Sequence, residues 1–225
     1  MPTTSPPSAS VGETAYRRIR GDIIFGKLAP GQKLRLEQLR EAYGASVSTL
    51  RELLNRLASE GLVEAEGQKG FMVAPVSARN LREIAAMRLL LERHALAQSL
   101  EAGDMEWEGR VVAAHHKLAQ MERRMLERAT PEPELWKRYD WEFHHALISA
   151  CGSQVLLETH AAIYDKYLRY QMVAVIFRGE IAAREHQALL DCSLDRDAAG
   201  AAEILGRHID GCVDHTLALE PFDGS

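Results

Sequence analysis

Four residues in the C-terminal two-thirds of the chain have the types and spacing of a metal site: Asp140, His144, His186 and His208. Asp140 and His144 are four positions apart, so on a helix their side chains share one face. His186 and His208 lie in two later segments, each with the apolar periodicity of a helix. Three imidazoles and one carboxylate suit a borderline divalent cation and can leave coordination positions open. We therefore predict a divalent metal site, with zinc first and nickel, manganese or iron as alternatives.

Spacing alone leaves open whether two further residues bind the metal, and whether the site serves catalysis or structure instead of ligand binding. His215 follows His208 by seven positions on nearly the same face, and Cys212 follows it by four, so either can join the metal site. A metal-dependent hydrolase or non-haem iron oxygenase also uses a histidine and carboxylate site with open positions. Glu142 does not hold the place of the general base in a hydrolytic HExxH pattern, which favours ligand binding over catalysis. A purely structural metal is the third alternative.

The elements that must position these side chains are helices. Glycine, proline and aspartate breaks divide residues 78–220 into about six predicted helices. Their spans are 79–102, 105–128, 133–151, 154–177, 180–192 and 196–218. Leucines such as Leu90 and Leu96 are expected to fill the buried stripe of the first helix. The sequence thus predicts a mainly α fold with an all-helical C-terminal body.

Residues 13–76 have the pattern of a winged helix-turn-helix domain, behind a Pro-, Ser- and Thr-rich tail of residues 1–12 that is expected to be disordered. Helices are expected around residues 16–23, from residue 36, and after a cap at Ser46 or Ser48. Gly44 falls at the corner before the third helix, and Gly61 ends that helix. Strands near residues 62–64 and 71–74 flank a hairpin of the wing type.

A third helix of this kind enters the major groove of DNA by its N-terminal end. The residues predicted to approach DNA are Ser46, Ser48, Thr49, Arg51 and Arg56 of that helix, and Gln68, Lys69 and Gly70 of the wing. A forked contact from Arg51 to guanine is worth ~1–3 kcal/mol of discrimination between bases. The alternative is a small helical module used for protein contact.

Residues 21–77 resemble the N-terminal DNA-binding domain of GntR-family transcriptional regulators. The matching pieces are the PG turn, the LRE of the third helix, the RLASEGLV run and the glycine-flanked wing. The resemblance implies that Arg51 is a DNA-contacting arginine and that Arg35, near the second helix, contacts phosphate. The chain departs from the family at Val47, where an arginine is common, so no base contact is expected there.

The body resembles the FCD effector domain of the FadR-type branch of that family. The segments that carry the resemblance are EIAAMRLLLERHALAQ, YDWEFHHALISACGSQVLLE, REHQALLDCSLDRDAAGA and EILGRHI. In that domain a D-x3-H pair and two later histidines bind a divalent metal, and they match the four residues named above one for one. The resemblance also implies that Arg88 turns toward the carboxylate of an effector, with Arg169 as a second candidate. A surface pair with Glu92 is the alternative for Arg88.

Together these patterns predict a homodimeric transcriptional regulator, a repressor first, whose affinity for palindromic double-stranded operator DNA is controlled by a small organic acid. The segments GDMEWE, QKGFMVA and ACGSQVLLE are similar to those of a carbon-starvation-induced repressor of glutarate and 4-aminobutyrate use, which implies a dicarboxylate such as glutarate or 2-hydroxyglutarate. The body, residues 78–220, would hold the metal and the acid, while residues 13–76 would hold the DNA.

Composition and charge agree with a protein that contacts DNA locally. The chain has 225 residues, 46% hydrophobic and 26% charged, which are ordinary globular values. Residues 1–76 hold 10 Lys/Arg and 8 Asp/Glu, a net charge of +2, and residues 77–225 hold 17 and 24, a net of −7; the sum is the −5 of the whole chain. No run approaches the ~18 apolar residues of a membrane helix, no signal peptide is seen, and three dispersed cysteines fit reduced thiols. We therefore expect a cytoplasmic protein with no membrane partner.

Overall fold

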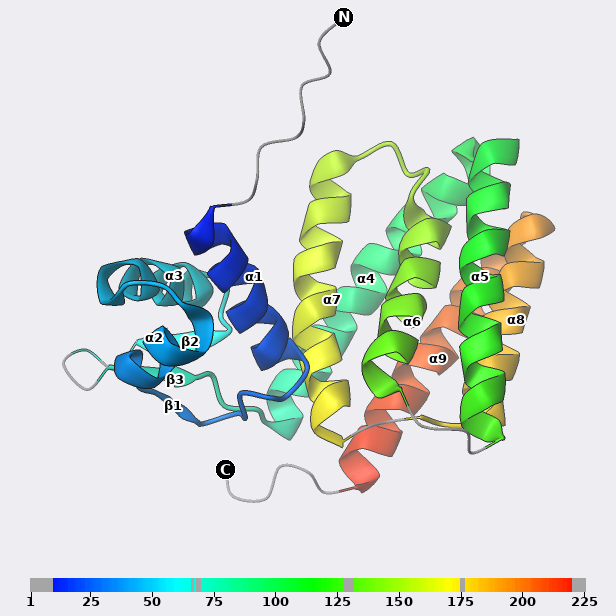
Figure 1. Ribbon diagram of the computed structural model, residues 1–225. Coiled ribbons are helices and arrows are strands. Elements are labelled where there is room, and N and C mark those ends of the chain that lie inside the picture. The colour runs from blue at the N-terminus through cyan, green and yellow to red at the C-terminus, as the bar shows by residue number, and fades with distance from the viewer. Residues whose placement is uncertain (1–9, 66, 68–69, 128–131, 175–176, 220–225) are drawn as a thin grey trace, which may run out of the picture. The chain divides into compact units, whose positions relative to one another are not determined.

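The computed structural model describes residues 10–65, 67, 70–127, 132–174 and 177–219 (Figure 1). The chain divides into two compact units, Met1–Val76 and Ser77–Ser225. Each unit has its own helices and its own core, and each is described by itself below.

The first unit is a three-helix domain with a small sheet. Its elements in chain order are α1 (Val11–Ile24), β1 (Lys33–Leu34), α2 (Leu36–Tyr43), α3 (Val47–Ser59), β2 (Val63–Ala65) and β3 (Phe71–Val73). The sheet is antiparallel with the order β1-β3-β2, and Leu34 lies opposite Phe71. The helices and the β2–β3 hairpin confirm the predicted winged helix-turn-helix. The two-residue strand β1 was not predicted, because two residues are too few to show alternation.

The ends of these helices follow from their capping residues. Helix α1 begins at Val11, two residues inside the predicted tail, because the Ser10 hydroxyl accepts a hydrogen bond from the Glu13 amide at 3.1 Å. At the corner between α2 and α3, Gly44 has φ +69°, a left-handed conformation that side chains with a Cβ rarely adopt. Ser46, rather than Ser48, caps α3.

The core of the first unit lies between α1, α3 and the sheet. Ile19 and Ile23 of α1 and Leu50 and Leu54 of α3 are fully buried. They recur every three or four residues, which places them on one face of each helix. Burial of this face fixes the opposite face of α3 toward solvent.

Within the described residues, the second unit contains six helices, as predicted. They are α4 (Ala78–Ala102), α5 (Met105–Leu126), α6 (Pro133–Ile148), α7 (Gln154–Ala174), α8 (Glu180–Leu194) and α9 (Ala198–Ala218). Ser77, Asp104 and Asp197 cap α4, α5 and α9 with their side-chain oxygens. None of the helices in the described part of the chain is long and apolar enough to cross a membrane.

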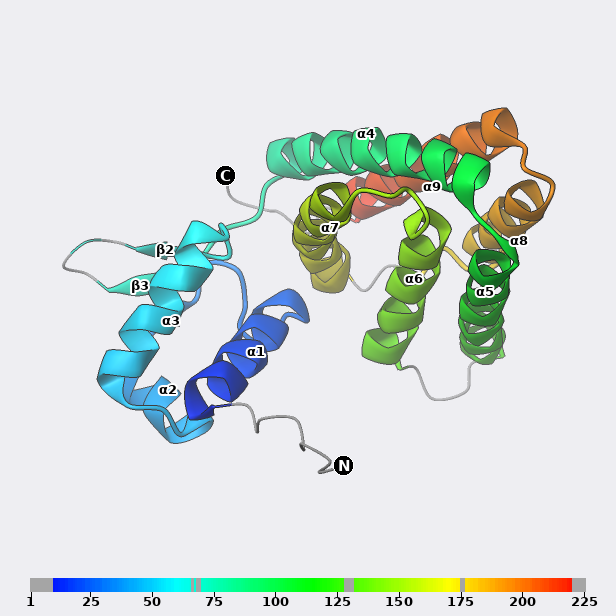
Figure 2. The same ribbon diagram turned by 90° about the horizontal axis from the view of Figure 1, so that it is seen from above.

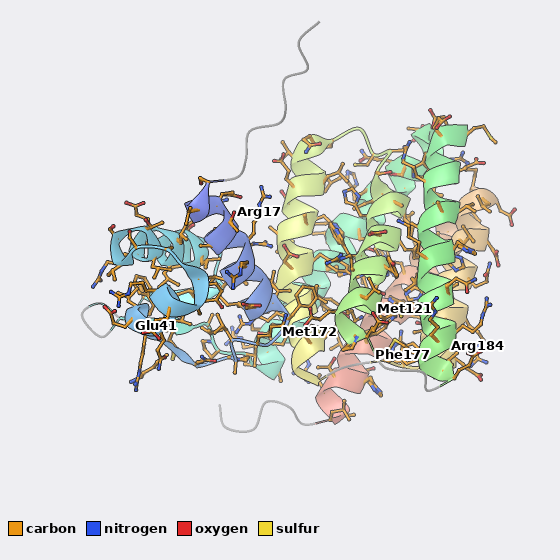
Figure 3. All side chains as sticks on the ribbon, viewed as in Figure 1. Arg17, Glu41, Met121, Met172, Phe177 and Arg184 are labelled. Carbon is orange, nitrogen blue, oxygen red and sulfur yellow. The ribbon has the colours of Figure 1, made fainter. Side chains whose placement is uncertain are left out.

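The six helices pack around one buried centre. Helices α4 and α9 run side by side in both views, and α5 lies next to α6 and α8 (Figures 1 and 2). Trp107 of α5 is fully buried and its indole N–H donates to the carbonyl oxygen of Ala146 in α6 at 2.9 Å. Met121 of α5 points into the bundle, whereas Arg184 of α8 lies at its surface (Figure 3). Large apolar side chains therefore hold the bundle together away from its polar centre.

Helix α4 departs from the predicted apolar stripe. Leu90 was expected in the core but is 64% exposed, while Leu96 is buried as expected. The buried positions one helical turn apart are instead taken by Arg88 and Glu92, which are 0% and 1% exposed. Because the two side chains pair with each other, the helix can turn this polar edge inward.

Candidate functional site

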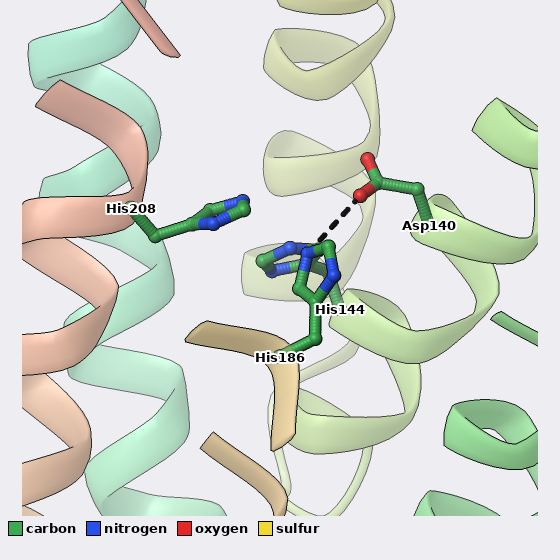
Figure 4. A group of neighbouring side chains, drawn as sticks. All are labelled: Asp140, His144, His186 and His208. Atoms are coloured by element: carbon green, nitrogen blue, oxygen red, sulfur yellow. Dashed lines mark ion pairs between the residues drawn. The ribbon is translucent and has the colours of Figure 1, made fainter. Parts of the chain in front are cut away.

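Asp140, His144, His186 and His208 meet at the centre of the second unit (Figure 4). Asp140 and His144 come from α6, His186 from α8 and His208 from α9. All four are buried, and one possible ligand atom from each lies within 4.8 Å of the others. The spacing of the two α6 residues explains why both face inward, and packing of α8 and α9 brings the other two to the same point.

A carboxylate from a helix stands behind each imidazole. Glu122 of α5 lies 2.7 Å from Nδ1 of His186, and Glu185 of α8 lies 2.9 Å from Nδ1 of His208. Glu92 of α4 contacts Nδ1 of His144. A carboxylate that accepts the Nδ1 hydrogen of a neutral imidazole leaves the Nε2 atom with the lone pair that can bind a metal. This is the arrangement by which proteins orient histidine ligands toward a metal.

Asp140 is held in a similar way. Its Oδ2 accepts a hydrogen bond from the hydroxyl of Tyr164 at 2.5 Å and lies 3.5 Å from Lys137 Nζ. Its Oδ1 lies 3.3 Å from Nε2 of His186. Burial opposes the charged form, but Lys137 and the two nearest histidines outweigh it and hold the pKa of Asp140 well below its usual range. Asp140 is therefore an ionised carboxylate with one oxygen directed at the cluster.

The charges around the histidines differ. Burial lowers the pKa of His208 well below its usual value. Burial also opposes the charge of His186, but the carboxylates of Asp140 and Glu122 outweigh it and raise its pKa to about 9. Burial opposes ionisation of Glu185 too, but hydrogen bonds from His208 and Arg178 lower its pKa to about 2. Without a metal, His186 is therefore expected to carry a proton on both ring nitrogens, and thus a positive charge, at neutral pH.

The donor set fits a divalent metal. Nε2 of His144 is buried and has no hydrogen-bond partner among the described residues, and Nε2 of His186 is buried with Oδ1 of Asp140 at 3.3 Å as its nearest partner. A buried polar atom is rarely left in the state of the His144 Nε2 atom, so a ligand at this point is expected. Three nitrogens and one carboxylate oxygen are the donors that zinc, nickel, manganese and iron accept. No cysteine or further histidine of the described chain belongs to the cluster.

The two residues that were left open as further metal ligands, His215 and Cys212, lie outside the cluster of donor atoms. His215 is exposed on α9, away from the buried cluster. Cys212 is buried and lines a small cavity next to the cluster, but its sulfur is not among the clustered donor atoms. Glu142 pairs with Lys117 at 2.9 Å at the surface and so faces away from the cluster, as expected.

The two arginines predicted for an effector are both buried. Arg88 donates from Nε to Glu92 at 2.8 Å, and its guanidinium lies between the rings of Tyr164 and Tyr167. The pair with Glu92 exists, but it is buried rather than at the surface as the alternative held. Arg169 is buried on α7, and neither arginine lines the cavity beside the cluster.

Several residues of the site were missed from the sequence. Glu122, Glu185, Tyr164 and Lys137 surround the ligands, and His160 donates from Nε2 to Glu92 at 3.0 Å. His160 is fully buried against Trp141, with its ring nearly parallel to the indole at 13°. A glutamate at i+4 from Arg88 was visible in the sequence, but its role as a support for His144 was not.

The predicted DNA-contact residues of the first unit gather at the start of α3. Ser46 accepts a hydrogen bond from the Thr49 amide at 3.2 Å, and its hydroxyl lies 2.9 Å from that of Ser48. Arg51 is exposed and has no hydrogen bond or ion pair within the described residues. An uncommitted guanidinium near a helix N-terminus is well placed for nucleic acid.

The remaining residues of that set have varied surroundings. Arg56 stacks over the ring of Tyr16 at 3.6 Å and pairs with Glu13 at 3.4 Å, so it also stabilises the unit. Arg35 is exposed at the start of α2. Gly70 precedes β3 with φ +103°, while Gln68 and Lys69 fall outside the described residues.

Comparisons with known proteins match both units. Residues 11–73 match the bacterial regulatory proteins of the gntR family, and residues 83–211 match the FCD domain. BphR of Paraburkholderia xenovorans (strain LB400), an uncharacterised HTH-type transcriptional regulator, is 36% identical over 206 residues, which cover 91% of this chain and 84% of that protein. The HTH-type transcriptional repressor GlaR of Escherichia coli (strain K12) is 32% identical over 200 residues, covering 86% and 90%. The structure of E. coli McbR/YncC agrees in fold, with a TM-score of 0.79 at 22% identity and coverage of 94% and 99%.

Proposed function

Because this chain belongs to the GntR family of bacterial transcriptional regulators and carries an FCD domain, we propose that it is a repressor whose hold on operator DNA is released by a small carboxylate bound at the metal centre. The family and the relatives are DNA-binding transcriptional regulators and not enzymes. The site agrees with this, since the carboxylates around the cluster support histidines and none is placed as a free general base. The observation that carries the proposal is the buried cluster of four donor residues, in which Nε2 of His144 has no partner among the described residues.

DNA would be bound by the N-terminal end of α3. Ser48, Thr49 and the exposed Arg51 are the residues of α3 that we assign to the major groove, with Ser46 at its cap. Arg35 and the wing residues Gln68, Lys69 and Gly70 would approach phosphate or the minor groove, and Arg56 would support them from its stack on Tyr16. Operator DNA lies in the bacterial cytoplasm, so the proposal places the protein there.

The metal would be held by Asp140, His144, His186 and His208. FCD domains bind metals, and the donor set here suits zinc first, with nickel, manganese or iron as alternatives. A bound dication supplies a Lewis acid that attracts a carboxylate oxygen. FCD domains also bind small-molecule effectors, and we infer an organic acid here, a dicarboxylate such as glutarate or 2-hydroxyglutarate. Arg88 and Arg169, the arginines predicted for its other end, are buried in the same unit but do not line the cavity beside the cluster, so either would reach the acid only after a rearrangement.

Two copies of the chain would bind a palindromic operator. Paired half-sites lie about one helical turn of DNA apart, so two heads with the right spacing are needed. Helix α4 supports a dimer, because Met87 and Leu90 are 43% and 64% exposed on the side away from the buried Glu92. The acid can change the spacing of the heads only by binding one arrangement more tightly than the other.

The test is a gel shift with DNA from upstream of the gene for this protein. We expect the metal-loaded protein to bind this DNA, and glutarate or 2-hydroxyglutarate to release it unless a chelator has removed the metal. Arg51→Ala should abolish specific binding while circular dichroism stays unchanged, and Arg184→Ala, an exposed arginine of α8, is the matched control. DNA binding that ignores every acid at full metal occupancy would contradict the effector part of the proposal.

A further inference from the structure

The cluster opens into a small cavity whose walls include two cations. The cavity has a volume of about 10 Å³, roughly the room that one water molecule needs, and it is lined by Trp136, Lys137, Asp140, Arg178, Ala182, His186, His208 and Cys212. Among the described residues that line it, Lys137 and Arg178 are the only arginine or lysine residues. An acid that reaches the cluster from this side would have to widen the cavity, and it would then lie beside these two side chains.

Most permanent cations around the centre already have a carboxylate of their own. Arg178 donates to both oxygens of Glu185, and Arg88 donates to Glu92. Neither glutamate is a predicted metal ligand, because each accepts the Nδ1 hydrogen of a histidine instead. These pairs therefore stay intact when a metal binds.

Lys137 is different. Its side chain is only 3% exposed, and its Nζ lies 3.9 Å from the centroid of the Trp136 ring. Within the described residues, the one carboxylate near it is Asp140, whose Oδ2 is 3.5 Å away. That distance is at the limit of a hydrogen bond, and the same oxygen already accepts from Tyr164. Lys137 is thus weakly paired to a residue that the metal requires.

Metal binding would weaken the counter-charge of this ammonium. A dication at Oδ1 of Asp140 would share the negative charge of the carboxylate and add positive charge near Lys137. A buried charge whose partner is partly neutralised is unfavourable, because protein cannot replace the water it has given up. The charge can be balanced again by an anion that enters the cavity.

On the basis of the proposed function, we propose that Lys137 is the anion-reading residue of the effector site: once the metal is bound, its ammonium pairs with a carboxylate group of the acid. Arg178 offers a further donor, since its Nε is buried without a hydrogen-bond partner in the described chain. Metal and acid then bind in that order. A neutral analogue of the acid, such as an amide, would leave Lys137 unpaired and be rejected.

The test compares Lys137→Met with the wild type and with Lys117→Met, a lysine that is 53% exposed and pairs with Glu142 outside the cavity. Each protein is loaded with zinc, its metal content is measured by elemental analysis, and binding of glutarate and 2-hydroxyglutarate is followed by calorimetry. We expect full zinc occupancy in all three proteins. Affinity for the acids should fall about tenfold or more in Lys137→Met alone, the size expected for a lost hydrogen bond to a charged group.

The outcomes separate this inference from the proposed function. If zinc-loaded wild type binds none of the acids, the proposed effector fails, and the inference with it. If the wild type binds an acid and Lys137→Met binds it equally well, only the inference is overturned. Loss of zinc from Lys137→Met would also overturn it, because Lys137 would then serve the metal and not the acid. Lys137→Gln gives the same comparison if the methionine variant does not fold.

Discussion

Each histidine of the centre depends on a carboxylate that is far away in the chain. Glu122 and His186 are 64 residues apart, yet their side chains approach to 2.7 Å. In the proposed metal site, the glutamate would fix the ring and direct its Nε2 atom at the metal. We therefore expect residues outside the four proposed ligands to contribute to the affinity for metal.

Glu122→Gln tests this dependence. The amide keeps the shape but lacks the charge, so metal affinity should fall roughly 10–100-fold, as for other residues that orient metal ligands. Zinc competition with a coloured chelator measures the affinity. Glu142→Gln is the matched control, because Glu142 pairs with Lys117 at the surface of the same unit. Equal zinc affinity in wild type and Glu122→Gln would contradict the supporting role.

The carboxylates around His186 also predict that a proton is released when the metal binds. Asp140 and Glu122 raise the pKa of His186 to about 9 against the effect of burial, so its ring is protonated in the metal-free protein at pH 7. Zinc can bind only after that proton leaves, and we expect release of about one proton per zinc at pH 7. The affinity should rise with pH up to about 9 and then level off. Calorimetry in two buffers of different ionisation enthalpy counts the proton; a count of zero at pH 7 would contradict the assignment.

Among the elements, the connection between α4 and α5 has a strict requirement. A Cβ at Gly103 would lie 2.5 Å from Cε3 of Trp107 and 2.7 Å from the carbonyl oxygen of Ser99. The indole is fully buried and hydrogen-bonded to α6, and the other neighbour is backbone, so neither can move away easily.

Gly103→Ala should therefore destabilise the protein by about 1–3 kcal/mol, the usual effect of overpacking. Gly109, within α5, has nothing within 4 Å of its Cβ position. Gly109→Ala should stabilise by about 0.5–1 kcal/mol, because alanine favours the helix. Urea unfolding of the two variants gives the comparison, and similar stabilities would show that the close approach at Trp107 is not needed.

Helices can be predicted from the sequence more readily than the packing between them. The six helices and the Asp140–His144 pair follow from local periodicity and spacing. Convergence of His186 and His208 on that pair needed a family resemblance, because spacing within one helix says nothing about packing between helices. An inward position of Arg88 was implied only by the family resemblance, since an apolar stripe is assigned from hydrophobic residues and does not distinguish a paired, buried arginine from one at the surface. Lys137 was missed for the same reason.

For the whole molecule, two separate cores imply that a metal in the proposed site would stabilise one of them directly. All four proposed ligands belong to the second unit, Ser77–Ser225. A ligand present at 100 times its dissociation constant stabilises the folded form by about 2.7 kcal/mol. We expect chelation to speed hydrogen exchange in α6, α8 and α9 and to leave the amides of α1 and α3 unchanged. Measurement by mass spectrometry decides this, and a matching loss of protection in α1 and α3 would mean that the units unfold together.

Every helix of the second unit reaches the centre. Glu92, Glu122, Tyr164 and Glu185 come from α4, α5, α7 and α8, and the ligands come from α6, α8 and α9. A shift of any one helix therefore alters the surroundings of one ion. If cobalt(II), whose visible spectrum depends on its coordination, occupied the site, its spectrum would report on the positions of all six helices. Rearrangements too small to change helix content would then be seen as a change of colour.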